Sequence, residues 1–243
     1  MSAAPRILVA GDAALIVEFG DAIDPAINRR VRGLFLAAEG ARLAGVRDLV
    51  PTYRSLLVSY DPLHTTCAAL SERLSTLAAH LDDTPVPPPR VVEIPTAYGG
   101  AFGPDLGFVA AHNRLAEDEV VAIHSGTDYL VYMMGFSPGF TYLGGLSERI
   151  AAPRLDTPRT AIPAGSVGIA QMQTGIYPVE SPGGWRLIGR TPVSLFDPSR
   201  HPPVVVDAGD YIRFVPVTPD EYASTLDAVR RGTWAPRIRN VTP

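Results

Sequence analysis

Short strand-forming runs, separated by glycine and proline, fill most of the chain after residue 127. Runs rich in β-branched and aromatic residues occur at 128–136, 166–170, 175–179, 185–189, 193–196, 203–206 and 210–216. The glycines and prolines between them supply the backbone conformations that tight turns require. Many short strands with frequent turn signals favour a closed or nearly closed β-barrel. We therefore expect the second part of the chain to be mainly β.

Three helices are expected beside these strands. Asp105 starts a short one, and a second covers about 117–125 and stops at Gly126. The last begins with the capping box Thr218–Glu221 and ends at Gly232.

Residues 1–84 show a different pattern, in which strands and helices alternate. Strands are expected at 6–10, 13–19, 46–50 and 55–60, and helices after Asp24 and at about 65–81. Asp24 can cap the first helix, with Pro25 at its first position. The order β-β-α-β-β-α predicts a small α+β domain with both helices on one face of an antiparallel sheet.

A proline run, TPVPPP at 84–89, separates the two patterns. A run of this kind acts as a stiff spacer. We therefore expect an α+β domain at 1–84, a linker at 85–89 and a β-barrel domain at 90–243. Hydrophobic residues make up 46% of the chain, which is enough to give each domain a core.

Composition excludes several classes of protein. The net charge of −4 and the lack of a basic stripe argue against nucleic-acid binding. Cys67 is the only cysteine, which excludes a disulfide framework and a cysteine-rich zinc site. The N-terminal residues lack the apolar run of a signal peptide, and no segment approaches transmembrane length. A cytoplasmic protein without membrane contact is expected.

Common catalytic motifs are also missing. The sequence has no G-x-x-x-x-G-K-[ST] phosphate loop, no G-x-G-x-x-G after a strand, no H-E-x-x-H and no G-x-S-x-G. The five histidines show no metal-ligand spacing. His124 stands out because it closes the helix before the barrel strands. It could be a cation at a helix end or a catalytic group.

The segment 162–192, IPAGSVGIAQMQTGIYPVESPGGWRLIGRTP, concentrates turn formers and polar side chains. Glycine lets a ligand approach the backbone closely, and exposed N–H groups can form an anion-binding nest. Arg190, with Arg159 just before the segment, could clamp a carboxylate or phosphate. Tyr177 and Trp185 could wall a pocket. The alternative, that the glycines only turn barrel corners and Trp185 belongs to the core, stays open.

Long motifs in one order give a resemblance to a known family. MGFSPGFTYLGGL at 134–146, Pro158-Arg159 and the segment from 162 to 198 carry it, with further matches such as GDAALIVEFG and DAGDYIRFVP. They resemble the family whose members are called the B subunit of 5-oxoprolinase, allophanate hydrolase subunit 1 or sporulation-kinase inhibitor. The resemblance covers nearly the whole chain and implies an α+β N-terminal domain followed by a cyclophilin-like barrel. One departure is Gln171, where the family usually has glycine.

The resemblance implies a subunit of an ATP-dependent 5-oxoprolinase, which opens 5-oxo-L-proline to L-glutamate. The expected partners are a larger cyclophilin-like subunit and a separate lactam-hydrolysing subunit, and ATP, with Mg²⁺, would be bound by the complex. Two alternatives are an inhibitor of a histidine kinase and a carboxyltransferase subunit of the allophanate or urea carboxylase type. A prolyl isomerase is suggested by fold analogy alone.

The expected site lies along 162–192. The candidate catalytic residues are His124, Gln173 and Arg190, and the candidate substrate- or phosphate-binding residues are Arg159, Gly165, Ser166, Thr174, Tyr177, Ser181, Gly183, Gly184 and Trp185. Backbone N–H groups, Gln173, Thr174 and Arg190 would stabilise charge that develops on the lactam oxygen. Because no nucleophile–base pair is recognisable, we expect the chain to be inactive alone.

Overall fold

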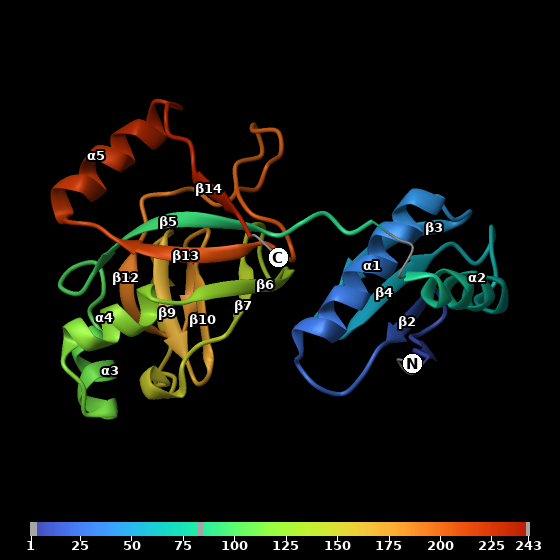
Figure 1. Cartoon of the computed structure of the whole chain (residues 1–243), viewed down its shortest axis with the longest axis horizontal. Coiled ribbons are helices and arrows are strands. Elements are labelled where there is room, and N and C mark those ends of the chain that lie inside the picture. Colours follow the sequence, from blue (N-terminus) through green and yellow to red (C-terminus); the bar gives the residue numbers. More distant parts are fainter. Residues whose placement is uncertain (1–3, 82–84, 242–243) are drawn as a thin grey trace. The chain divides into compact units, whose positions relative to one another are not determined.

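The computed structural model describes residues 4–81 and 85–241 (Figure 1). Contacts divide the chain into two compact units, Met1–Pro88 and Pro89–Pro243. The expected end of the first domain, at residue 84, lies outside the described residues. Residues 85–89 form neither helix nor strand.

The first unit is an antiparallel sheet covered by two helices. Its elements are β1 (Arg6–Val9), β2 (Ala14–Glu18), α1 (Pro25–Ala41), β3 (Val46–Pro51), β4 (Ser55–Tyr60) and α2 (Cys67–Ala79), and the sheet order is β1-β2-β4-β3. Alternate residues such as Leu15, Val17 and Val58 are fully buried in one core with Leu34 of α1 and Leu74 of α2. One face of the sheet therefore carries both helices, as the sequence predicts.

Both helices of the first unit begin at capping residues. The Asp24 carboxylate accepts hydrogen bonds from the backbone N–H groups of Ala26 and Ile27, which confirms the expected cap. The second helix begins at Cys67, later than predicted, because the Thr66 hydroxyl caps it by accepting from the N–H of Ala69, and it ends at Ala79. Cys67 is a half-buried free thiol in the first turn of this helix.

The second unit is a closed barrel. Its strands are β5 (Arg90–Tyr98), β6 (Asp128–Met134), β7 (Thr141–Gly144), β8 (Arg159–Ile162), β9 (Ser166–Ala170), β10 (Gln173–Ile176), β11 (Ser181–Gly183), β12 (Arg186–Arg190), β13 (Tyr211–Pro216) and β14 (Arg237–Asn240). Hydrogen bonding follows the order β12-β9-β10-β7-β6-β13-β5, and β5 pairs with β12 to close the ring. The predicted barrel is therefore present. β14 pairs with β5 outside the ring, and β8 and β11 form a small separate sheet.

Helices lie around the barrel (Figure 1). They are α3 (Leu106–Asn113), α4 (Glu117–Ser125), the 3-10 turn η2 (Glu148–Ile150) and α5 (Pro219–Arg230). The expected capping box of α5 is present, with Thr218 and Glu221 bonded to each other. No helix among the described residues is long and apolar enough to cross a membrane.

The structure corrects two of the predicted strands. Segments 193–196 and 203–206 are not strands, and a single bridge between Phe196 and Val204 is all that joins them. Prolines at 192, 198, 202 and 203 surround these runs and cannot donate to a ladder, which prevents longer pairing.

Candidate functional site

The glycine-rich segment forms β9, β10, β11 and β12, and several of its glycines are needed for close packing. Gly165 has φ +80°, and a Cβ there would lie 2.2 Å from the Thr191 carbonyl oxygen. A Cβ on Gly183 would lie 2.5 Å from the Tyr177 hydroxyl. At these two positions, glycine allows close packing against another segment of the chain.

Tyr177 and Trp185 lie in a buried aromatic cluster with Phe140. Each pair of rings meets edge to face, with centroids 6.0 to 6.2 Å apart. Burial raises the pKa of Tyr177. Trp185 therefore occupies the core position that the sequence left as an alternative, and Tyr177 is buried in the same cluster.

Arg159 is engaged within the protein. Its guanidinium donates to the Asp105 carboxylate at 2.9 Å, while the second Asp105 oxygen accepts from the Leu187 N–H at 2.7 Å. The Asp105 side chain makes no helix-capping bond and instead ties the start of α3 to β8 and β12. Sequence reasoning named Asp105 only as a helix start, because its partners are distant in the chain. An ion pair to a buried carboxylate leaves Arg159 poorly placed to clamp a ligand.

Arg190 and Ser166 each carry a buried polar atom without an internal partner. The two residues are opposite each other in the antiparallel pairing of β12 with β9, so their side chains share one face of the sheet. The Ser166 hydroxyl oxygen and the Arg190 Nε are buried, and neither has a hydrogen-bond partner among the described residues. Buried polar groups are rarely left unpaired. The structure thus places two unused polar groups together at the end of the glycine-rich segment.

The positive charge of Arg190 faces α5. It lies near the Tyr222 hydroxyl, where it opposes the rise in the pKa of Tyr222 that burial causes. No acidic side chain among the described residues forms an ion pair with Arg190. The guanidinium is therefore available to an anion.

His124 is fully buried inside the second unit. Its Nδ1 lies 2.8 Å from the Tyr98 hydroxyl and its Nε2 lies 2.8 Å from the Thr174 hydroxyl. The Thr174 hydroxyl donates to the Gly168 carbonyl, so His124 Nε2–H donates to Thr174 and Nδ1 accepts from Tyr98. Burial lowers the pKa of His124 to about 3. The histidine is neutral, and the helix-end cation considered from the sequence is wrong.

The remaining candidates do not converge on one point. Strand alternation places Gln173 and Thr174 on opposite faces of β10, with Thr174 directed toward His124. Ser181 and Gly183 lie in β11, where Gly183 is opposite Arg159, and Gly184 follows that strand. The expected residues thus separate into a His124–Thr174 pair, an Arg159–Gly183 pair and the Arg190–Ser166 pair.

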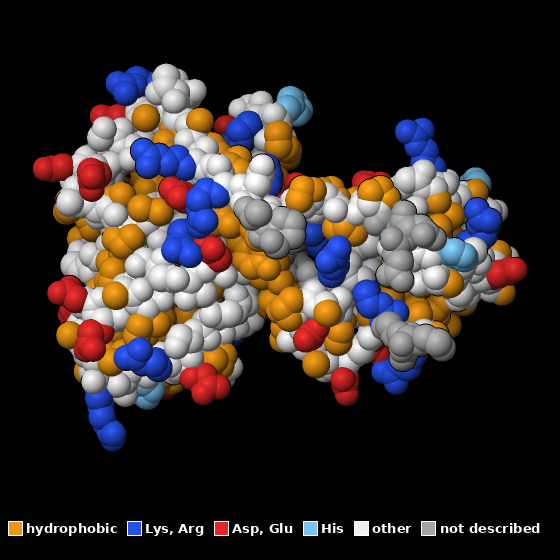
Figure 2. Space-filling model, in the orientation of Figure 1, with side chains coloured by type: hydrophobic (Ala, Val, Ile, Leu, Met, Phe, Trp, Pro, Cys, Tyr) orange, Lys and Arg blue, Asp and Glu red, His pale blue; other side chains and the backbone are white. Residues whose placement is uncertain are grey.

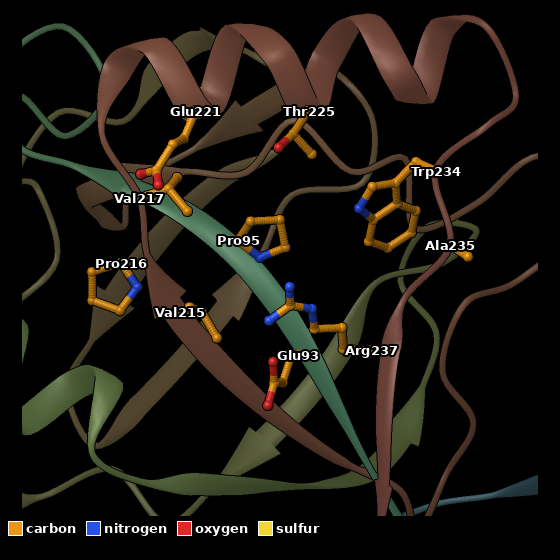
Figure 3. A pocket seen from close by; sticks show the side chains of 10 residues that line it. All are labelled: Glu93, Pro95, Val215, Pro216, Val217, Glu221, Thr225, Trp234, Ala235 and Arg237. Atoms are coloured by element: carbon orange, nitrogen blue, oxygen red, sulfur yellow. The ribbon is translucent and has the colours of Figure 1, made fainter.

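Sequence reasoning missed a groove beneath α5. It has a volume of about 460 Å³ and is lined by Glu93, Pro95, Val215, Pro216, Val217, Glu221, Thr225, Trp234, Ala235 and Arg237 (Figure 3). One feature of the sequence points to this groove: only a few residues of α5, such as Tyr222, Leu226 and Val229, form its apolar side. None of its described residues is buried.

Charges on the protein surface are mixed. On the face shown in Figure 2, basic and acidic side chains are interspersed with hydrophobic ones. Within residues 4–81 and 85–241, no group of three or more His, Cys, Asp or Glu side chains could hold a metal ion.

Known proteins resemble the chain over most of its length. The 5-oxoprolinase B subunit of Bacillus subtilis (strain 168) is 43% identical over 226 residues, which cover 87% of this chain and 92% of that protein. The 5-oxoprolinase B subunit of Escherichia coli O157:H7 is 41% identical over 211 residues, covering 87% of this chain and 95% of that protein.

Two solved structures share the fold within longer chains. The crystal structure of TTHA0988 is 36% identical with a TM-score of 0.75, and the match covers 84% of this chain and 40% of that one. The Kluyveromyces lactis urea amidolyase is 22% identical with a TM-score of 0.78, covering 98% of this chain and 16% of that one. At that identity, the second likeness shows the fold alone.

A family described as carboxyltransferase domain, subdomain C and D, matches residues 5–206. The match spans the first unit and most of the barrel, including the segment that carries Ser166 and Arg190. The chain belongs to this carboxyltransferase-domain family.

Proposed function

We propose that this chain is the B-type subunit of a multi-component, ATP-dependent 5-oxoprolinase. The observation that carries the proposal is the match to the 5-oxoprolinase B subunits of two bacteria, at 43% and 41% identity over 92% and 95% of their lengths. Similarity over nearly the whole length of such relatives favours the same role in the same kind of assembly. We also propose that the barrel is of the cyclophilin-like type.

The site we propose is the Arg190–Ser166 pair. An arginine fork can bind two oxygens of a carboxylate or phosphate, and a serine hydroxyl can donate a third hydrogen bond. The Ser166 hydroxyl and the Arg190 Nε lack internal partners, so a ligand oxygen would satisfy groups that are otherwise buried unpaired. ATP would supply a phosphoryl group that makes the lactam carbonyl carbon electrophilic. Arg190 and Ser166 would hold the anionic group in place.

A complete reaction needs more than this chain offers. His124 has both ring nitrogens bonded inside the protein, and its lowered pKa keeps it neutral. We assign it a structural role, holding α4 to β5 and β10. We propose that a larger cyclophilin-like subunit and a lactam-hydrolysing subunit complete the enzyme in the cytoplasm, and that the complex binds ATP together with Mg²⁺.

A carboxyltransferase subunit of the urea carboxylase type is the second candidate. The family that matches residues 5–206 is described as a carboxyltransferase domain. The two bacterial 5-oxoprolinase subunits match over nearly their whole lengths at 43% and 41% identity, so this candidate ranks second.

Reconstitution tests the proposal. The purified chain alone should release no glutamate from 5-oxo-L-proline and ATP, and glutamate should appear once both partner subunits are added. An assay of urea carboxylation on the same mixture tests the second candidate, the carboxyltransferase subunit. Full turnover by the chain alone would refute the need for partners.

A further inference from the structure

The groove beneath α5 combines an apolar floor with polar walls. Pro95 of β5 and Val215 of β13 form the floor, and Thr225 projects from α5 above (Figure 3). Trp234 lies on the segment before β14, and Arg237 is the first residue of β14. Its volume of about 460 Å³ falls within the range of small-molecule sites, roughly 300–1,000 Å³. None of these residues belongs to the Arg190–Ser166 pair.

Three hydrogen-bond donors line this groove, and the Arg237 side chain among them is exposed to solvent. The Arg237 guanidinium, the Thr225 hydroxyl and the Trp234 indole N–H have no hydrogen-bond or ion-pair partner within the described part of the chain. In Figure 3 the Thr225 hydroxyl and the indole nitrogen face the space around Pro95, and the guanidinium reaches toward the same space from below. Converging donors around an apolar floor suit a ligand that carries oxygen acceptors on a compact body.

The two acidic residues of the groove already have partners. Glu93 pairs with Arg239 at 3.6 Å, and the Glu221 carboxylate accepts from the N–H and hydroxyl of Thr218. Hydrogen bonds from Thr218 lower the pKa of Glu221. Arg237 lies opposite Glu93 in the pairing of β14 with β5 but forms no ion pair with it. Arg237 is therefore the charged side chain of this lining that neither pairs with nor hydrogen-bonds to another described residue.

We propose that the groove beneath α5 is a second binding site, for a small carboxylate with a flat ring. Arg237 holds the carboxylate through two parallel hydrogen bonds, and the ring lies between Pro95 and Trp234. Thr225 and the indole N–H donate to further oxygens of the ligand. This chemistry fits 5-oxo-L-proline, a choice of ligand that rests on the proposed function, whereas the open-chain product L-glutamate keeps the carboxylate but lacks the ring.

The indole N–H signals in an NMR spectrum of the full chain test this site. The chain has two tryptophans, Trp185 and Trp234, so Trp234→Phe assigns the signals. Adding 5-oxo-L-proline should shift the Trp234 signal saturably and leave the buried Trp185 signal in place. Arg237→Met should weaken binding by a factor on the order of ten or more, since each ~1.4 kcal/mol is tenfold. Arg149→Met, at an exposed arginine on η2, is the matched control and should bind like the wild type.

Two comparison ligands define the chemistry. The neutral carboxamide of 5-oxo-L-proline should bind at least about tenfold more weakly, and L-glutamate should also bind more weakly because it lacks the ring. Equal binding of the carboxamide, equal binding by Arg237→Met, or an unmoved Trp234 signal would each overturn the proposal. Thr225→Val, which keeps the side-chain shape, gives a second reading if Arg237→Met fails to fold. The proposed function is tested separately, and it is refuted if the assembled subunits release no glutamate.

Discussion

Arg190 is the residue whose role can be tested most cleanly. Arg190→Lys keeps the charge but loses the planar fork, so we expect kcat/KM of the assembled enzyme to fall by a factor on the order of ten or more. Because the Arg190 Nε has no internal partner, thermal stability should hardly change. Steady-state kinetics and a melting curve on the same preparation measure both effects.

Arg159→Lys is the natural comparison for that experiment. Its guanidinium is paired with the buried Asp105 carboxylate, so this change should lower the melting temperature. Wild-type kinetics in Arg190→Lys would remove Arg190 from the site. Parallel losses of stability and activity in both variants would indicate that Arg190 is structural too.

At the residue scale, sequence reasoning could identify arginines but not their partners. Arg159 and Arg190 looked equivalent, since both lie in or beside glycine- and proline-rich segments. Asp105, whose carboxylate pairs with Arg159, lies 54 positions away in the chain. The neutral state of His124 likewise depends on Tyr98 and Thr174, which only the folded barrel brings to its ring.

At the scale of elements, the turn between β9 and β10 shows why glycine would suit the position that Gln171 occupies. This residue is exposed and has φ +54°, a left-handed conformation that favours glycine, and its N–H donates to the Ala152 carbonyl at 2.6 Å. The side chain therefore lies at the surface and narrows no pocket.

Gln171→Gly should raise the free energy of unfolding by up to about 2.5 kcal/mol. Relief of left-handed strain, on the order of 1–3 kcal/mol, is partly offset by the larger entropy of glycine in the unfolded chain, about 0.5–1 kcal/mol. Activity should stay unchanged. Chemical denaturation measures the effect, and Met172→Gly, at a neighbour without positive φ, should instead destabilise the turn. A loss of stability in Gln171→Gly would contradict this account.

The sequence predicts a strand correctly where a run of residues pairs with a neighbouring strand along its whole length. β9, β12 and β13 lie where the sequence indicates. β8, β11 and β14 are short, and β14 is exposed throughout, so no alternation marks it. The apolar runs at 193–196 and 203–206 looked like strands because their prolines were read only as turn signals.

At the scale of the whole molecule, each unit has its own core. The buried residues of the first core all come from the segment before the proline run, and those of the barrel core all come from the segment after it. We propose that residues 90–243 form an independent domain, as residues 1–84 do, with 85–89 as the linker. The barrel and the α+β layer could be predicted from strand and helix periods, whereas the groove beneath α5 needs the packing of distant segments.

Separate expression of residues 90–243 tests this division. The fragment should unfold cooperatively and give near-UV circular dichroism of packed aromatic side chains, because His124, Phe214 and the Phe140 cluster keep all their contacts. A fragment that lacks a cooperative transition would show that the barrel depends on the first unit.

Coupled product release by the reconstituted enzyme tests the central claim most directly. ADP and glutamate are measured together from 5-oxo-L-proline and ATP, with all subunits present and with this chain left out. We predict that both products appear in step when the chain is present and that glutamate falls to background without it, while the Arg190→Lys chain restores only a fraction of the rate. An unchanged rate of glutamate release in the absence of this chain would contradict its assignment as a subunit of a 5-oxoprolinase.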